Sequence, residues 1–144
     1  MSYNGLKNDL NCFAKFSYIY ETDIKKLVKE IEFSNKYKDA FQHSWKNLKK
    51  QVKYTKINEL ENMIIENDNN NYSLYYTKSK VLILDFCRHF RNSFSHALTN
   101  RKQGKLFIND KKGVKNTCLG FVNYSDVKEF IIEIIKEYEL RAND

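Results

Sequence analysis

Residues 87–98 combine side chains suited to phosphate chemistry within one short stretch. They include Arg91, Asn92 and His96. An arginine guanidinium can bind two phosphate oxygens at once. A histidine imidazole titrates near neutral pH, so it can take up a proton and return it during a reaction. These residue types therefore predict phosphoryl chemistry.

Other chemistries fit this stretch less well. His89 and His96 are seven residues apart, two helical turns, which is too far for one metal ion without further ligands. Ser93 and Ser95 lack the Gly-x-Ser-x-Gly context of a nucleophile elbow between a strand and a helix. We therefore predict no metal centre, no serine nucleophile and no cofactor.

An apolar helix over residues 73–95 is expected to carry these groups. At 100° per residue, one face of this helix holds a polar stripe opposite its phenylalanines. The stripe consists of Asp85, His89, Asn92 and His96. It contains no lysine or glutamate, the residues that normally occupy exposed helix positions, so we expect this face to meet something.

The position of Arg91 sets a condition on where the helix ends. A regular helix through His96 would point Arg91 and His96 about 140° apart. The two side chains can work together only if the helix ends near residues 93–95, or if the working pair forms between two subunits.

The other segments are also interpreted mainly as helices. Apolar residues at spacings of three and four predict helices over 6–20, continuing to 33 as one bent helix or two, over 35–66, and from a Ser125 cap to 138. Two short apolar runs at 105–109 and 117–122 predict a hairpin whose connection is longer than in the tightest hairpins. A polar run at 66–71 is expected to end the segment that begins at 35, whether that segment is one helix or a hairpin.

These elements predict one domain over residues 1–144, an all-α, up-and-down bundle of four to five helices with a small β-hairpin before the last helix. A hydrophobic content of 42% excludes a disordered chain. Three cysteines without a Cys-x-x-Cys pair argue against a disulfide framework and a zinc ribbon. No apolar run approaches a membrane span, so we expect a soluble, cytoplasmic protein.

Basic charge is concentrated in the middle of the chain. The net charge is +7, and residues 81–124 hold eight lysines and arginines against two acids. A local basic excess is typical of proteins that bind nucleic acid, although a lysine-rich composition with solvated lysines gives the same pattern.

The string from Arg88 to Ala97 resembles the signature of the HEPN superfamily of small all-α ribonucleases. It contains an Arg-x4-His motif with a polar residue directly after the arginine, at the end of a hydrophobic helix. In the fuller string and in the order of helices, the chain is similar to stand-alone prokaryotic HEPN nucleases of toxin and defence systems. Leu98 stands where one subgroup, paired with a nucleotidyltransferase antitoxin, has a tyrosine, which argues against that subgroup.

The resemblance implies a metal-independent endoribonuclease that acts as a homodimer, with the motifs of two subunits facing one cleft. His96 would then be the acid and base for attack of a 2′-hydroxyl on the adjacent phosphate, Arg91 would stabilise the developing charge, and Asn92 would orient the substrate or His96. The residues expected to bind RNA are Arg88, His89, Ser95, Arg101, Lys102 and Lys105. Such an enzyme would serve as a toxin or antiviral defence effector, restrained by an antitoxin or another regulatory partner.

Two other interpretations remain open from the sequence. The chain can be a HEPN-like module that binds RNA or a protein without catalysis. It can also be a helical DNA-binding or antitoxin-like protein, although no helix-turn-helix spacing supports this. Separately, Arg88 and His89 can be structural residues that pair with Asp85 or the acidic last helix instead of binding a phosphate. None of these interpretations includes a membrane partner.

Overall fold

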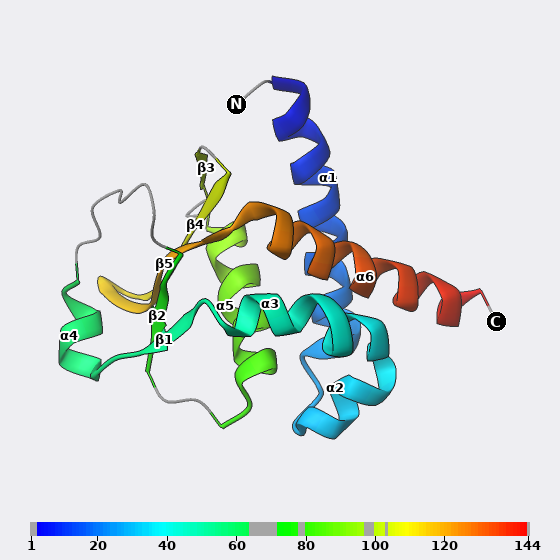
Figure 1. Cartoon of the computed structure of the whole chain (residues 1–144), viewed down its shortest axis with the longest axis horizontal. Helices are drawn as coiled ribbons and strands as arrows, with labels where there is room; N and C mark the ends of the chain where they lie inside the picture. The colour runs from blue at the N-terminus through cyan, green and yellow to red at the C-terminus, as the bar shows by residue number, and fades with distance from the viewer. Residues whose placement is uncertain (1–2, 64–71, 78–79, 97–99, 103, 144) are drawn as a thin grey trace.

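The computed structural model describes residues 3–63, 72–77, 80–96, 100–102 and 104–143, without the side chains of residues 3–8, Asn100 and Lys102. This part of the chain forms six α-helices, two π-helical turns and one five-stranded sheet (Figure 1). The helical elements are α1 (Tyr3–Ile19), the π-turn η1 (Tyr20–Ile24), α2 (Glu30–Lys36), the π-turn η2 (Ala40–Ser44), α3 (Trp45–Lys49), α4 (Ile57–Glu61), α5 (Leu82–Ser95) and α6 (Tyr124–Ala142). The strands are β1 (Val52–Tyr54), β2 (Leu74–Tyr76), β3 (Asn100–Lys102), β4 (Lys105–Lys112) and β5 (Lys115–Asn123). The prediction of an all-α bundle is therefore wrong, because the fold combines helices with a sheet.

The predicted hairpin forms the centre of that sheet. The strand order is β1-β2-β5-β4-β3, with β1 parallel to β2 and the other pairs antiparallel. Strands β4 and β5 pair from Lys105 opposite Asn123 to Lys112 opposite Lys115. A two-residue turn joins them, with Gly113 at φ 66°. The connection is thus as tight as hairpin connections become, and the prediction of a longer loop is wrong.

Strands β1 and β2 lie inside two segments that were predicted to be helical. Val52, Tyr54 and Tyr76 are of the β-branched and aromatic types that favour strands. Strand β5 offers its open edge to β2, and Gly120 permits this approach, since a Cβ there would lie 2.0 Å from the Ser73 carbonyl oxygen. The helix predicted over 73–95 therefore begins only at Leu82.

The ends of the other helices also differ from the prediction. The N-terminal helical region is divided, because α1 passes into η1 and α2 begins afresh at Glu30, where the Glu32 side chain accepts from the Lys29 N–H at 2.8 Å. The N-cap of α6 is Asn123, which accepts from the Asp126 N–H at 3.0 Å, and the predicted Ser125 cap is wrong. The predicted break at 66–71 lies outside the described residues.

An aromatic cluster between α1, α5 and α6 fixes the position of α5. Phe90 is fully buried, and its ring centroid lies 5.0 Å from that of Phe13 and 5.5 Å from that of Phe16. Phe86, one turn earlier, lies 5.8 Å from Phe130 of α6. Burial of each such ring contributes about 2 kcal/mol of transfer free energy. Because this cluster holds α5 on one side, the polar stripe must face another way.

None of the helices in the described residues has the length and apolar character needed to cross a lipid bilayer.

Candidate functional site

Helix α5 ends where the proposed chemistry requires it. Its last residue is Ser95, and His96 follows as the C-cap, with φ −96° and ψ 13°. The His96 N–H donates to the Asn92 carbonyl at 3.1 Å. The His96 side chain is exposed and makes no hydrogen bond or ion pair with the described part of the chain. The first of the two conditions derived from the helix geometry, an end near residues 93–95, is confirmed.

The polar stripe of α5 meets the sheet, through Asp110 of β4. His89 is buried, and its Nδ1 lies 2.8 Å from Oδ2 of Asp110. Asn92 Nδ2 donates to the same oxygen at 3.3 Å. Oδ2 of Asp110 is therefore within hydrogen-bond distance of two side chains of the stripe, one turn apart on α5. The expectation that this face meets something is therefore confirmed for His89 and Asn92, and their contact lies within the chain. It is not confirmed for His96, whose side chain is exposed.

The main chain of β4 also binds α5. The hydroxyl of Ser93, which is fully buried, accepts from the Asn109 N–H at 3.0 Å. On the next residue, the carbonyl of Asp110 accepts from the Thr117 hydroxyl of β5 at 3.0 Å. Strands β4 and β5 therefore hold Asp110 in place against α5, which gives the hairpin a positioning role.

Asn92 connects this buried carboxylate to Arg91. Nη1 of Arg91 donates to Asn92 Oδ1 at 3.1 Å, while the Asn92 amide nitrogen donates to Asp110. Asn92 was predicted to orient the substrate or His96. In the structure it orients the guanidinium of Arg91.

A carboxylate from η1 occupies the other side of the guanidinium. Nη2 of Arg91 lies 2.7 Å from Oε1 of Glu21, and the Arg91 side chain is 30% exposed. Nε of Arg91 is buried and has no hydrogen-bond partner among the described residues. The guanidinium is thus held by Asn92 and Glu21, and it still reaches solvent.

The residues predicted to bind RNA do not form one surface. Arg88 and Ser95 are exposed, and Arg88 pairs with Asp85 at 3.1 Å. Lys105 is only 3% exposed, with Nζ 5.6 Å from the centre of the Phe121 ring and no hydrogen-bond partner in the described chain. Lys102 lies on β3, and its side chain is outside the described part.

Arg101, also predicted to bind RNA, belongs to a separate cluster around Asp9. Its Nη1 lies 3.3 Å from Oδ2 of Asp9, and its guanidinium carbon stacks 3.6 Å from the Tyr124 ring centre. The Tyr124 hydroxyl donates to Asp9. Burial and this hydrogen bond raise the pKa of Tyr124. Arg101 therefore joins α1, β3 and α6.

Sequence reasoning missed Asp110 and Glu21. A weak signal for Asp110 was present, because it is one of two acids in the basic stretch 81–124. Its place in β4 was not predicted, since the first strand of the hairpin was expected to end at 109. Glu21 had no comparable signal, since it is one of several surface acids and reaches Arg91 only through the packing of η1 on α5.

The cysteines add no reactive group to this site. Cys87 lies one turn before Arg91 on α5 and is fully buried, as is nearly all of Cys118 on β5. Burial raises the pKa of both thiols, so they stay protonated at neutral pH.

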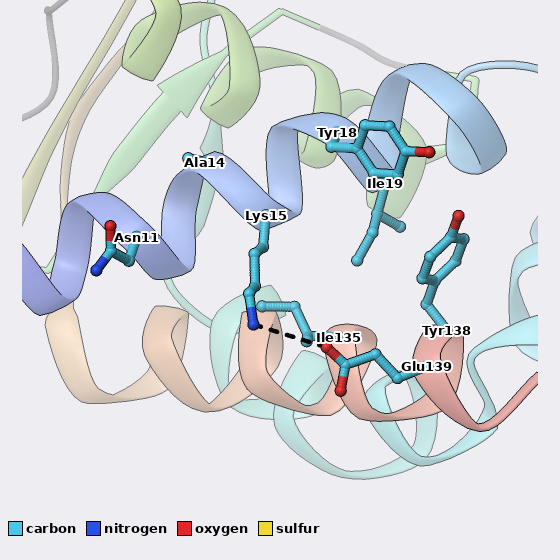
Figure 2. Close-up of a pocket in the computed structure, with 8 residues that line it drawn as sticks. All are labelled: Asn11, Ala14, Lys15, Tyr18, Ile19, Ile135, Tyr138 and Glu139. Carbon is cyan, nitrogen blue, oxygen red and sulfur yellow. Dashed lines mark ion pairs between the residues drawn. The ribbon is translucent and has the colours of Figure 1, made fainter. Parts of the chain in front are cut away.

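A groove of about 680 Å³ lies away from these residues, between α1 and α6 (Figure 2). Tyr18 and Tyr138 face each other across it with ring centroids 6.5 Å apart, and Lys15 pairs with Glu139 at 3.7 Å. None of the residues predicted for catalysis or RNA binding lines this groove.

Comparison of the chain with models of protein families, with curated proteins and with solved structures finds no match.

Proposed function

We propose that the chain is a metal-independent endoribonuclease of the HEPN type, acting as a homodimer. The observation that carries this proposal is the arrangement at the end of α5. An exposed imidazole, His96, follows the helix. The partly exposed guanidinium of Arg91 is held by Glu21 and by Asn92, which is bound in turn to Asp110. This arrangement offers a proton acceptor and a fixed cation on one helix end.

The reaction uses these two groups in defined steps. His96 takes the proton of a ribose 2′-hydroxyl, and the resulting oxygen attacks the adjacent phosphorus. Arg91 stabilises the negative charge that develops on the phosphate oxygens. The bond from phosphorus to the 5′-oxygen then breaks, and that oxygen takes a proton. The products are a 2′,3′-cyclic phosphate and a 5′-hydroxyl end.

A dimer accounts for the need for both an acid and a base. Attack and departure of the leaving group occur on opposite sides of the phosphorus, so one imidazole cannot easily serve both. With two chains facing one cleft, the His96 of one protomer acts as the base and that of its partner as the acid. A toxin or antiviral defence effector, restrained by a regulatory partner in the cytoplasm, is the role that we propose for such an activity.

Cleavage of RNA in the presence of EDTA tests this proposal. Purified protein should yield fragments ending in 2′,3′-cyclic phosphate. His96→Ala should slow cleavage about 10²–10⁴-fold. Arg91→Ala should slow it about 10²–10³-fold, and Arg91→Lys should restore only part of the rate because lysine cannot bind two oxygens in a fork.

The matched control is His43→Ala, since His43 is another exposed histidine and lies on η2. This variant should cleave at the wild-type rate. Full activity in His96→Ala or Arg91→Ala, with the melting temperature unchanged, would exclude the proposal.

A second function has its own observation. Both terminal nitrogens of Arg91 are already engaged, by Asn92 and by Glu21. This favours a HEPN-like module that binds RNA or a protein without cutting. Such a module would bind RNA with an affinity that falls as the salt concentration rises. It would produce no RNA fragments ending in 2′,3′-cyclic phosphate under any condition.

A further inference from the structure

Three potential metal ligands meet where η2 packs on α6. They are His43 of η2 and two glutamates one turn apart on α6, Glu129 and Glu133. Nδ1 of His43 lies 2.6 Å from Oε1 of Glu133 and 3.4 Å from Oε1 of Glu129. One ligand atom from each residue lies within 4.8 Å of the others.

We propose that these three residues form a binding site for a divalent transition metal, for which Zn²⁺ is the best fit. Zn²⁺ binds imidazole nitrogen and carboxylate oxygen at about 2.0–2.2 Å, so two of its ligands in a tetrahedral site lie about 3.3 Å apart. The two distances from His43 to the glutamates lie on either side of this value. To admit the ion, Nδ1 of His43 must exchange its hydrogen bond with Glu133 for the metal, and these two atoms must move apart by about 0.7 Å.

The identity of the ligands selects the class of metal. A nitrogen donor beside two carboxylates suits zinc and its neighbours in the first transition row, whereas Mg²⁺ and Ca²⁺ prefer sites made of oxygen alone. The presence of His43 also distinguishes this group from a cluster of surface acids, because the imidazole supplies the donor that such clusters lack.

Glu133 is held in position by a second hydrogen bond. Its Oε2 accepts from the Ser44 hydroxyl at 2.8 Å, so that Oε1 faces His43. Ser44 is fully buried, and the Glu133 side chain is 17% exposed. Such support of a ligand from behind is a common feature of protein metal sites, where it fixes the ligand's orientation.

A neighbouring contact fixes the turn that carries His43. Oε1 of Glu137, one turn further along α6, accepts from the Asp39 N–H at 3.0 Å, and Oε2 accepts from the Ala40 N–H at 3.4 Å. The start of η2 is thereby attached to α6, which sets His43 opposite Glu129 and Glu133 before any ion arrives.

The site is open on one side. The side chains of His43 and Glu129 are 64% and 45% exposed. His43 and Glu133 line a groove of about 490 Å³ together with Asp39, Gln42, Lys136, Glu137 and Leu140. A zinc ion with three protein ligands keeps a fourth position for water or another small ligand, and the groove leaves room for it.

The bound ion would connect η2 to α6. Neither element carries Arg91 or His96. The site is therefore separate from the proposed ribonuclease residues, and either proposal can fail without the other.

The test is a zinc titration of tag-free, full-length protein that has been stripped with EDTA and desalted. Isothermal titration calorimetry should give one Zn²⁺ per chain, and the melting temperature should rise with zinc. Co²⁺ in place of Zn²⁺ should give visible absorption bands that saturate at the same ratio.

Three variants each remove one ligand, and a fourth serves as the control. His43→Ala, Glu129→Gln and Glu133→Gln should each weaken zinc binding at least about tenfold, equivalent to 1.4 kcal/mol. Glu129 is exposed, and its only contact in this cluster is with His43, so Glu129→Gln should fold normally. The control, Glu139→Gln, removes a carboxylate of the same helix that pairs with Lys15, and it should bind zinc as the wild type does.

Two results would overturn the site. One is the absence of saturable zinc binding to the wild-type protein, which would leave His43 as an ion-pair partner of the two glutamates only. The other is equal binding by the wild type and Glu129→Gln, which would place the zinc elsewhere. Cleavage of RNA should be unchanged in all four variants.

Discussion

Asp23 and Asp110 are both buried carboxylates, but their surroundings differ in kind. Asp23 on η1 receives Lys36 Nζ at 2.8 Å, Arg141 Nη2 at 2.9 Å and the Tyr37 hydroxyl. Among the described residues, the carboxylate of Asp110 on β4 contacts His89 and the neutral amide of Asn92. Three permanent cations surround Asp23, because Lys26 Nζ also lies 3.9 Å from its Oδ1. The permanent cation linked to Asp110 is Arg91, which is connected to it through Asn92.

This difference indicates that Asp23 stabilises the fold, whereas Asp110 positions a candidate catalytic residue. The network of Asp23 joins η1, α2 and α6 and leads to no candidate catalytic group. The network of Asp110 leads through Asn92 to Arg91, which is 30% exposed near the end of α5. Asp110 is buried, whereas Arg91 is partly exposed at the other end of the hydrogen-bond chain. Asp110 can therefore orient the Arg91 guanidinium toward a ligand.

Among variants of these two networks, the largest expected effect is on the rate of RNA cleavage in Asp110→Asn. The amide keeps one acceptor oxygen but loses the charge, so it holds His89 and Asn92 less firmly, and Arg91 with them. A misplacement of Arg91 by about 1 Å can cost about 10²-fold in rate. The rate at saturating RNA should fall far more than RNA affinity does, because the charge of Arg91 remains. The comparison variant is Asp23→Asn, which should cleave normally. Equal rates in the two variants would remove the positioning role from Asp110.

Asp23→Asn should instead reduce the free energy of unfolding. The amide keeps one acceptor oxygen but no charge, so Lys36 and Arg141 lose their counter-ion. The expected loss is about 1–3 kcal/mol, which urea denaturation monitored by circular dichroism would measure. If the variant is as stable as the wild type, the contacts of Asp23 with α2 and α6 do not stabilise the fold.

The stability due to Asp23 should also depend on pH. Burial acts to raise the pKa of Asp23, but hydrogen bonds from Lys36 and Tyr37 and the nearby charges outweigh it, so the pKa lies below its usual value. A carboxyl whose pKa is lower in the folded than in the unfolded state stabilises the fold above the unfolded pKa. That contribution is lost as the pH falls through the folded value. The stability difference between wild type and Asp23→Asn should therefore narrow below about pH 4. A difference that stays constant down to acid unfolding would contradict this account.

The comparison also shows what the sequence could and could not predict. The end of α5 and the polar contact of its stripe followed from periodicity, since His89 and Asn92 share a face on any regular helix. The identity of the contact did not follow, because Asp110 is 18 residues from Asn92 and reaches it only through the sheet. Lys105 was predicted to bind RNA but is buried on β4. Its burial also results from packing of the sheet, which local patterns do not show.

The failure to predict strands β1 and β2 has a similar explanation. Strands β1 and β2 contain three residues each, too few to show a two-residue period against the helical spacing around them. Their partners are distant, since Leu74 pairs with Gly120. Pairing over such distances is a tertiary effect, which local patterns do not report. The hairpin was predicted because both of its strands lie within one stretch.

The smallest expected effect concerns Glu21, which contacts the exposed side of Arg91. An ion pair near the surface contributes about 0–1 kcal/mol, so Glu21→Gln should change stability little. If Glu21 competes with phosphate for the guanidinium, the variant should bind and cleave RNA up to about fivefold better, and the gain should shrink at high salt. The matched control, Glu30→Gln, alters the net charge equally at an exposed position on α2. An equal gain in both variants would show a general charge effect. Slower cleavage in Glu21→Gln alone would show that Glu21 helps Asn92 to position Arg91, and the network of Asp110 would then extend to η1.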